Sequence, residues 1–294
     1  MFCRVTCYIG FQPIGNKEIC KKISNFSKTP LQIGYNKIKY ICMKLCLHAK
    51  GRLERTTQMS TVAYKRILLK LSGEAMEGED NILDFDFVAR VAETIKKAVQ
   101  EGVEVSVVIG GGNIWRGRQS GKMDRTRADH MGMIATAINS IALQDTLIAC
   151  GVDAKVLSAL KIEPFAEYYS KDLAVKYLSE GKVVIFCCGT GSPYFSTDTG
   201  AVLRAAQIEA DALLFAKNID GVYTADPRID PTATKIDAIT YEEILEKHLT
   251  VIDTAATAFA LENNLKICLF GLDDPDNILR VIHGEKLGTL LTKK

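Results

Sequence analysis

The segment that decides the fold reads Tyr64-Lys-Arg-Ile-Leu-Leu-Lys-Leu-Ser-Gly-Glu-Ala75. Residues 66–71 form an apolar run that lacks the polar alternation of a half-exposed strand, which predicts a strand buried on both faces. The run ends at a charged residue, Lys70, and a glycine turn. Residues 103–109 repeat the pattern and are followed by the triple glycine 110–112. Two such strands predict a parallel sheet whose strand ends carry the function.

Working outward from this segment, strand-like and helix-like runs alternate along the chain. The predicted strands are 66–71, 103–109, 154–157, 183–188, 212–216 and 266–270, with an edge strand at 287–292. The predicted helices are 87–100, 129–150, 172–178, 199–208, 241–247 and 253–262. This order predicts an α/β fold, a three-layer α/β/α sandwich with a mainly parallel central sheet. Right-handed crossovers then bring the carboxyl ends of the strands to one edge, where ligands bind.

The first 58 residues differ in composition from the rest. They hold eleven Lys or Arg against two acids and five of the nine cysteines, without a helical or strand period. We expect residues 1–58 to be an extension outside the fold, disordered or not native, and 59–294 to be the domain, with Met59 as its functional start. An organellar transit peptide is the alternative interpretation of this extension.

The remaining chain excludes several classes of protein. It carries 33 acidic against 26 basic residues, which argues against nucleic acid as a primary partner. No apolar run is long enough to span a bilayer. Cysteines in apolar segments indicate a reducing compartment. We therefore expect a cytoplasmic protein without membrane attachment or disulfides.

Three glycine-rich segments, 70–74, 110–113 and 189–192, each follow a predicted strand. Glycine lets backbone N–H groups approach phosphate oxygens without a side chain in the way. None of the segments is a Walker A loop, and none completes the G-x-G-x-x-G dinucleotide pattern. The sequence therefore predicts a phosphate site of another design.

Charged residues near these loops are candidate ligands. Lys70 ends an apolar strand, a costly position unless an anion lies beside it. Arg116 follows the triple glycine and can reach a phosphate or lie in a solvated loop. Asp129 opens the long predicted helix, where it either caps the helix or binds a nucleoside hydroxyl. His130 has no nucleophile paired with it by motif, and no His or Cys spacing fits a metal site.

At these residues the sequence resembles a known family. The matching segments are 64–75, 108–113 with Arg116, 129–133, 189–198 and 220–227. In this order they resemble the signatures of the bacterial-type UMP kinases, a branch of the amino acid kinase superfamily. The resemblance runs from about residue 64 to the C-terminus and leaves residues 1–58 uncovered.

The resemblance implies the reaction ATP + UMP = ADP + UDP in pyrimidine nucleotide biosynthesis. The catalytic residues that it implies are Lys70, Asp198 and Lys217. The ATP-binding residues that it implies are Lys70, Leu71, Ser72, Gly73, Gly112, Arg116, Lys217, Asn218, Tyr223 and Asp226. The UMP-binding residues that it implies are Gly111, Asp129, Thr190, Gly191, Ser192, Pro193, Tyr194, Phe195, Ser196 and Thr197.

The chemistry of this reaction agrees with the residues present. A UMP phosphate oxygen is already anionic, so no general base is needed, and Mg²⁺ is expected to be held through ATP and water rather than by a protein cage. The resemblance also implies a homohexamer inhibited by UTP and activated by GTP. Residues 76–83 lack two glycines that it leads us to expect, which argues against GTP activation.

Two alternatives remain open from the sequence. One is a kinase of the same superfamily that acts on carbamate, acetylglutamate or aspartate, and the other is a nucleotide-binding protein without turnover. Residues 129–133 together with the acceptor segment 189–198 favour UMP over the first, and the presence of Lys70 and Asp198 argues against the second.

Overall fold

Strand β1 (Arg66–Leu71) lies in the middle of the sheet, between β2 (Glu104–Ile109) and β6 (Ala212–Lys217), and pairs in parallel with both. The structure is a computed structural model that describes residues 62–79, 81–116, 121, 123–225, 227, 229–247, 249 and 251–294. The expectation for residues 1–58 lies outside these described residues. Continuous apolar runs form the central strands, as predicted for strands that are buried on both faces.

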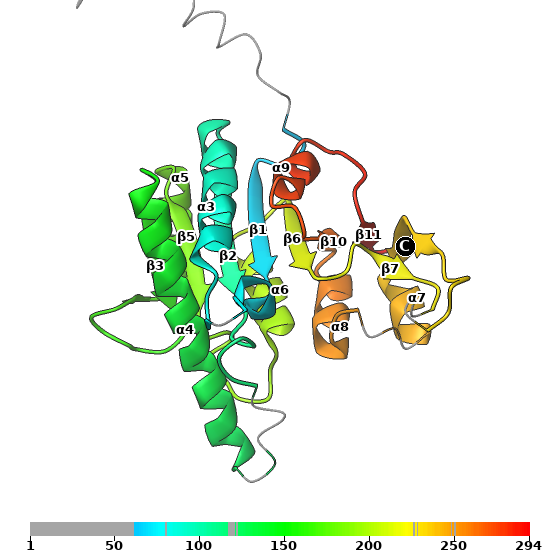
Figure 1. Cartoon of the computed structure of the whole chain (residues 1–294), viewed down its shortest axis with the longest axis horizontal. Coiled ribbons are helices and arrows are strands. Elements are labelled where there is room, and N and C mark those ends of the chain that lie inside the picture. Colours follow the sequence, from blue (N-terminus) through cyan, green and yellow to red (C-terminus); the bar gives the residue numbers. More distant parts are fainter. Residues whose placement is uncertain are drawn as a thin grey trace, which may run out of the picture. The chain divides into compact units, whose positions relative to one another are not determined.

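The main sheet of the described chain has nine strands in the order β4-β3-β5-β2-β1-β6-β10-β11-β9. The other strands are β3 (Ala154–Ser158), β4 (Glu167–Tyr168), β5 (Val183–Cys187), β9 (Ala238–Thr240), β10 (Ile267–Gly271) and β11 (Thr289–Thr292). Only the pairing of β10 with β11 is antiparallel among the described pairs of this sheet. In Figure 1 the arrowheads of β1, β2, β5 and β6 point to the same edge. The prediction of a mainly parallel sheet is confirmed.

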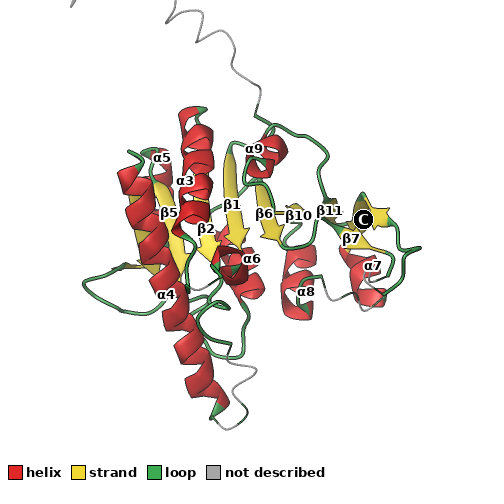
Figure 2. Cartoon of the chain, viewed as in Figure 1, coloured by secondary structure: helices red, strands yellow, loops and turns green. Residues whose placement is uncertain are grey.

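Helices cover both faces of the sheet (Figure 2). One layer contains α3 (Phe85–Gln100), α4 (Arg125–Ala149) and α9 (Asn277–Ile282). The other contains α5 (Lys171–Ser179), α6 (Thr197–Gln207), α7 (Tyr241–Glu246) and α8 (Thr254–Glu262). A 3-10 turn η2 (Gly73–Met76) follows β1, and a small ribbon joins β7 (Val222–Tyr223) to β8 (Lys235–Ile236). The predicted three-layer sandwich is therefore confirmed.

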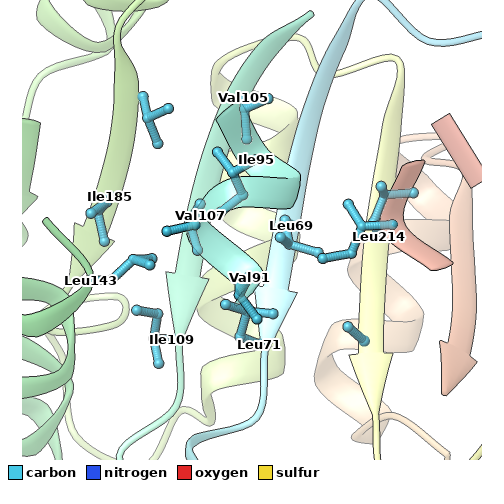
Figure 3. Packing of buried hydrophobic residues seen from close by; sticks show 14 of the residues in the cluster. Leu69, Leu71, Val91, Ile95, Val105, Val107, Ile109, Leu143, Ile185 and Leu214 are labelled. Atoms are coloured by element: carbon cyan, nitrogen blue, oxygen red, sulfur yellow. The ribbon is translucent and has the colours of Figure 1, made fainter. Parts of the chain in front are cut away.

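The alternation of side chains along β1 decides which layer each residue meets. Leu69 and Leu71 pack with Val91 and Ile95 of α3 in the first core layer, as Figure 3 shows. Each such buried aliphatic side chain contributes about 1.5–3 kcal/mol relative to an exposed one. Lys70 alternates with these leucines and therefore faces the opposite layer, which contains α6 and α8.

Helix α4 corrects two expectations. It begins at Arg125, capped by Asp124 whose side chain accepts from the Arg127 N–H, so Asp129 lies inside the helix and is not its cap. The predicted start was four residues late because the basic first turn resembles a loop.

By length and composition α4 is also apolar enough to cross a membrane, although 44% of that window is buried in the fold. It packs on β2, β3 and β5, as a core helix does.

The C-terminal strand is a further correction. The sequence predicted an edge strand at 287–292, but β11 lies between β10 and β9. Its pairing with β9 joins residues about fifty positions apart, which no local pattern reveals. The short helix α9 was also missed, because its six residues are too few for a helical period.

Candidate active site

Two lysines and one carboxylate meet at the carboxyl edge of the sheet. The Nζ atom of Lys70 lies 3.0 Å from Oδ1 of Asp198, and Nζ of Lys217 lies 3.5 Å from Oδ2 of the same residue. Lys70 is the penultimate residue of β1, Lys217 ends β6, and Asp198 lies in the first turn of α6. We call these three residues the lysine pair and its aspartate.

Strand register explains why the two lysines come together. Lys70 lies opposite Phe215 in the β1–β6 pair, and Lys217 follows two positions later on the same face. The two Nζ atoms lie 5.7 Å and 5.6 Å from the centroid of the Phe215 ring. Two buried strands therefore carry both positive charges over one apolar ring.

The charges shift the pKa values of this group. Burial by itself acts to raise the pKa of the Asp198 carboxyl, but the charges of Lys70 and Lys217 outweigh burial and hold that pKa below its usual 3.8. Burial lowers the pKa of Lys217 below its usual 10.5, and Lys70 adds to the effect, whereas Asp198 acts to raise it. The site thus holds two lysines with one anionic partner, a positive excess that a polyphosphate can neutralise.

Three cavities extend along this edge of the sheet. The first, which we call the acceptor cavity after the role proposed for it below, has a volume of about 370 Å³ and is lined by residues of the triple-glycine loop, the start of α4 and the segment 189–197. The central cavity, of about 750 Å³, includes Asp198 and Lys217 and shares Phe195 and Ser196 with the acceptor cavity. The donor cavity, of about 1320 Å³, includes Lys217, Asn218 and Tyr223. Asp198 and Lys217 line the central cavity, Lys217 also lines the donor cavity, and Lys70 pairs with Asp198 beside them.

The glycine loops after β1 and β2 press directly against each other. The Gly110 N–H donates to the carbonyl of Leu71 over 3.0 Å, so the two strand ends are tied together. A Cβ added at Gly73 would lie 2.5 Å from the Gly110 carbonyl oxygen and 2.6 Å from Oδ1 of Asn113. Only glycine allows this approach.

Replacing Gly73 by alanine is therefore expected to separate the loops. We expect a loss of about 1–3 kcal/mol in the free energy of unfolding, because backbone must move to accept the methyl group. The KM for ATP should rise as well. Urea unfolding measures the first effect and steady-state kinetics the second. Gly78→Ala is the matched control, since its added Cβ would lie no closer than 3.4 Å to any atom; equal stability of the two variants would contradict the prediction.

Helix α4 holds both loops that border the acceptor cavity. The Asn139 side chain donates to the Gly110 carbonyl over 2.7 Å, and Thr136 Oγ1 accepts the Cys188 N–H over 2.8 Å. Both side chains are buried and lie one turn apart on the helix. One rigid element therefore sets the spacing between the triple glycine and the loop after β5.

The acceptor segment is fixed by carboxylates from two helices. Asp129 accepts the backbone N–H of Tyr194 over 2.8 Å and also accepts Nε of Arg125. Asp253, which caps α8, accepts hydroxyl hydrogen bonds from Ser196 and Thr199 at the start of α6. The segment is thus held at Tyr194 and again at Ser196.

The residues predicted for ATP lie in different parts of this site. Asn218 and Tyr223 line the donor cavity, whereas Gly112 and Arg116 line the acceptor cavity. Arg116 pairs with Glu74 at 2.5 Å. Leu71 is fully buried, so only its backbone is available to a ligand. The prediction for Asp226 lies outside the described residues.

Most of the residues predicted for UMP line one cavity. Those that line the acceptor cavity are Gly111, Asp129, Thr190, Ser192, Phe195, Ser196 and Thr197. Tyr194 lines the central cavity and stacks under the Arg125 guanidinium, 5.3 Å from the ring centroid. Gly191 and Pro193 lie within the same loop but line none of the three cavities described above.

Sequence reasoning missed the contribution of the segment before α8. The carbonyl of Val251 accepts a hydrogen bond from Nζ of Lys217, and Leu249 lines both the central and the donor cavity. Asp253 is an obvious helix cap, and that signal was available. Its contact with the acceptor segment joins residues more than fifty positions apart, which the sequence does not show.

Comparison with known proteins assigns the family. The amino acid kinase family model matches residues 65–271. A uridylate kinase of Porphyromonas gingivalis is 51% identical over 233 residues, which cover 78% of this chain and 98% of the relative. The crystal structure of UMP kinase from Bacillus anthracis superposes with a TM-score of 0.76 at 36% identity, covering 79% of this chain and 97% of that one.

A second solved structure agrees. UMP kinase from Ureaplasma parvum matches with a TM-score of 0.74 at 40% identity, over 78% of this chain and 99% of that one. The range of the family model includes Lys70, Asp198 and Lys217. The chain belongs to the amino acid kinase family and, within it, to the bacterial-type UMP kinases.

Proposed function

We propose that ATP occupies the donor cavity and UMP the acceptor cavity, with their phosphates meeting at Lys70, Asp198 and Lys217. The chain is a UMP kinase that transfers the terminal phosphoryl group of ATP to UMP in pyrimidine metabolism. The observation that carries the proposed arrangement is the pairing of both lysines with one carboxylate, Asp198, which lines the central cavity that shares residues with the other two.

The transfer itself needs little covalent chemistry from the protein. A phosphate oxygen of UMP attacks the γ-phosphorus in line, a new P–O bond forms, and the bond to the ADP oxygen breaks. The attacking oxygen carries no proton near neutral pH, so no residue has to act as a base. Lys70 stabilises the charge on the transferring group, and Asp198 holds the two ammonium groups apart and in place.

The acceptor is proposed to lie along the segment 190–197. Its phosphate would meet the glycine loops, and its nucleoside would meet Asp129, whose carboxylate already orders Tyr194. On the donor side, Asn218 and Tyr223 are proposed to border the adenosine, with the Tyr223 hydroxyl held by Asp220 at 2.8 Å.

Magnesium is proposed to enter with ATP, bound to the phosphates of the substrate. Both carboxylates beside the central cavity already have partners, since Asp198 pairs with two lysines and Asp253 accepts from two hydroxyls. Neither offers the free oxygens that a dedicated magnesium cage requires.

The depressed pKa of Lys217 predicts an alkaline limit on activity. Because only the protonated amine neutralises phosphate charge, kcat/KM for ATP should fall as pH rises through the Lys217 pKa, with a midpoint below 10.5. A pH series of kcat/KM measures this midpoint. Lys217→Arg should remove the fall, because arginine stays charged; a fall that persists unchanged in this variant would assign it to another group.

A panel of acceptors tests the proposed function. Phosphoryl transfer from Mg-ATP is measured side by side with UMP, CMP, AMP, GMP, carbamate and acetylglutamate. We expect UMP to give the highest kcat/KM. A preference for any other acceptor would overturn the assignment of UMP as the substrate. No ADP formation with any of them would indicate a nucleotide-binding protein without turnover.

A homo-oligomer, a hexamer by resemblance, is proposed from the outer face of α4. That face presents a stripe of exposed apolar side chains at helical spacing, namely Met131, Ile134, Ile138, Ile141 and Ile148. Stripes of this kind mark association surfaces. Sedimentation velocity should show a single oligomer that dissociates in the double variant Ile134→Asp, Ile138→Asp and persists in Ile82→Asp, an exposed isoleucine outside this helix.

Regulation and location are proposed on separate grounds. We propose inhibition by UTP from the resemblance, no activation by GTP from the missing glycines of residues 76–83, and a cytoplasmic location from the cysteines in apolar segments. Adding each nucleotide to the UMP assay at fixed ATP tests the first two proposals.

A further inference from the structure

A buried arginine without an anionic partner lies beside the loop after β5, which we call the acceptor loop because it includes Gly189 and Thr190 of the acceptor segment. Arg204 of α6 is 6% exposed, and its guanidinium carbon lies 3.8 Å from the centroid of the Tyr169 ring. Nη1 donates to Oε1 of Gln207 over 2.7 Å, and Nη2 donates to the carbonyl of Gly189 over 3.3 Å. Within the described ranges no carboxylate forms an ion pair with it, so both acceptors are neutral.

Burying an unpaired cation is costly, and the pKa of this side chain reflects that cost. Burial lowers the pKa of the Arg204 guanidinium, although Tyr169 acts to raise it. A fold tolerates such a charge when a bound anion compensates it. Arg204 itself does not line the acceptor cavity, but Gly189, whose carbonyl it binds, does, so a ligand in that cavity is the anion within reach.

Close packing brings the loop onto α6. A Cβ added at Gly200 would lie 3.2 Å from Cα of Gly189 and 3.3 Å from its carbonyl carbon. Gly200 lies one turn before Arg204 on the same helix, which places the guanidinium under the Gly189–Thr190 peptide.

The other side of that peptide is free for a ligand. In the part of the chain that the structure describes, the N–H of Thr190, which belongs to this peptide, has no hydrogen-bond partner, and neither has the N–H of Gly189 in the preceding peptide. Both residues line the acceptor cavity. An arginine that donates to a peptide carbonyl polarises the peptide, which makes its N–H a stronger donor to an anion.

We propose that Arg204 is a positioning residue for the phosphate group of the acceptor, acting through the Gly189–Thr190 peptide. The inference rests on the proposed function, since it assumes that the acceptor phosphate lies at this loop. Arg204 thereby adds a further positive charge near the acceptor, although the side chain itself never touches the substrate. Arg204 acts on the binding of the acceptor phosphate. Its contribution to affinity should therefore be the same for any nucleoside monophosphate and absent for ATP.

Arg204→Met tests the inference, because methionine fills a similar volume without the charge. We expect the KM for UMP to rise about 10-fold, the size of one weakened hydrogen bond from the peptide N–H to a charged phosphate. The KM for ATP should stay within about twofold. Arg204→Lys, which keeps the charge, should recover part of the affinity. Gln207→Leu is the matched control: it removes the neighbouring acceptor of the same guanidinium, keeps the charge, and should leave the KM for UMP near the wild-type value.

Direct binding separates this inference from the proposed function. Calorimetric titration with UMP and with inorganic phosphate is run on the wild type and the three variants, with thermal unfolding as a check on the fold. Weaker binding of both ligands in a folded Arg204→Met supports the inference even if turnover with UMP is absent. Unchanged UMP affinity in that variant, or equal losses for UMP and ATP, overturns it while leaving the kinase activity standing.

Discussion

Lys70→Met is expected to lower kcat about 10³-fold while the protein stays folded. The ammonium group of Lys70 is the buried charge at the end of β1, within 3.0 Å of Asp198, beside the point where the two substrates would meet. Methionine keeps the length and the apolar stem but supplies no charge to the transferring phosphoryl group. Because this interaction is stronger in the transition state than in the ground state, kcat and kcat/KM should fall together.

Steady-state kinetics with Mg-ATP and UMP measure this effect. Lys155→Met is the matched control, since Lys155 is a partly exposed lysine on strand β3 of the same sheet, with only a loose 4.0 Å contact to Asp153. It should keep nearly wild-type activity. A kcat for Lys70→Met within about threefold of the wild type would refute the role given to Lys70, and a rise in KM alone would make it a binding residue only.

The central strands were predictable because each is a continuous apolar run that ends at a polar or glycine residue. β1, β2, β5 and β6 begin and end within one residue of their predicted bounds. The local signal is strong here because parallel strands covered on both faces need apolar side chains at nearly every position. The order of the strands in the sheet needed the structure, since pairing partners lie far apart in the sequence.

Segments with weak local signals were misplaced or missed. β9 and β4 are too short for a period, and β11 has its place between β10 and β9 through long-range pairing only. α4 began earlier than predicted because Arg125 and Arg127 look like loop residues, although they lie in its first turn behind the Asp124 cap.

Single residues of the candidate site were predictable from the sequence, whereas their meeting in space became clear only from the fold. Lys70 stood out by itself as a charge at the end of an apolar strand, but Asp198 and Lys217 were identified through the resemblance to a family. The register of β1 on β6 then explains their meeting, which no spacing along the chain indicates. Asp253 and Arg204 were not predicted, because each acts through a contact between distant segments.

The largest combined effect on stability and activity is expected for Asp198→Asn. Asparagine has the same size but no charge, so Lys70 and Lys217 would face each other without an anion between them. Removing one partner of a buried ion pair costs about 3–5 kcal/mol, because the remaining charge stays buried. We expect a loss of this order in the free energy of unfolding near pH 7, and a fall in kcat of about 10²-fold as the lysines lose their orientation.

The pKa of Lys217 determines whether the stability of Asp198→Asn rises or falls with pH. Asp198 acts to raise the pKa of Lys217 in the folded wild type, so its removal should lower that pKa further below 10.5. Over the interval between the folded pKa and 10.5 the unfolded chain binds more protons, so stability of the variant should increase as pH rises there. The alkaline fall of kcat/KM for ATP should move to lower pH for the same reason.

Urea unfolding at several pH values, together with a pH series of kcat/KM, measures both effects. Asp172→Asn is the matched control, because Asp172 is an exposed acid in the first turn of α5 and shares the helix position of Asp198 without its lysines. Loss of the helix-dipole contribution alone would affect both variants alike, by about 0.3–1 kcal/mol. A variant at position 198 that loses no more than this, and whose alkaline limb stays where it is in the wild type, would show that the carboxylate does not hold the two ammonium groups. The positive excess at the strand ends would then need another explanation.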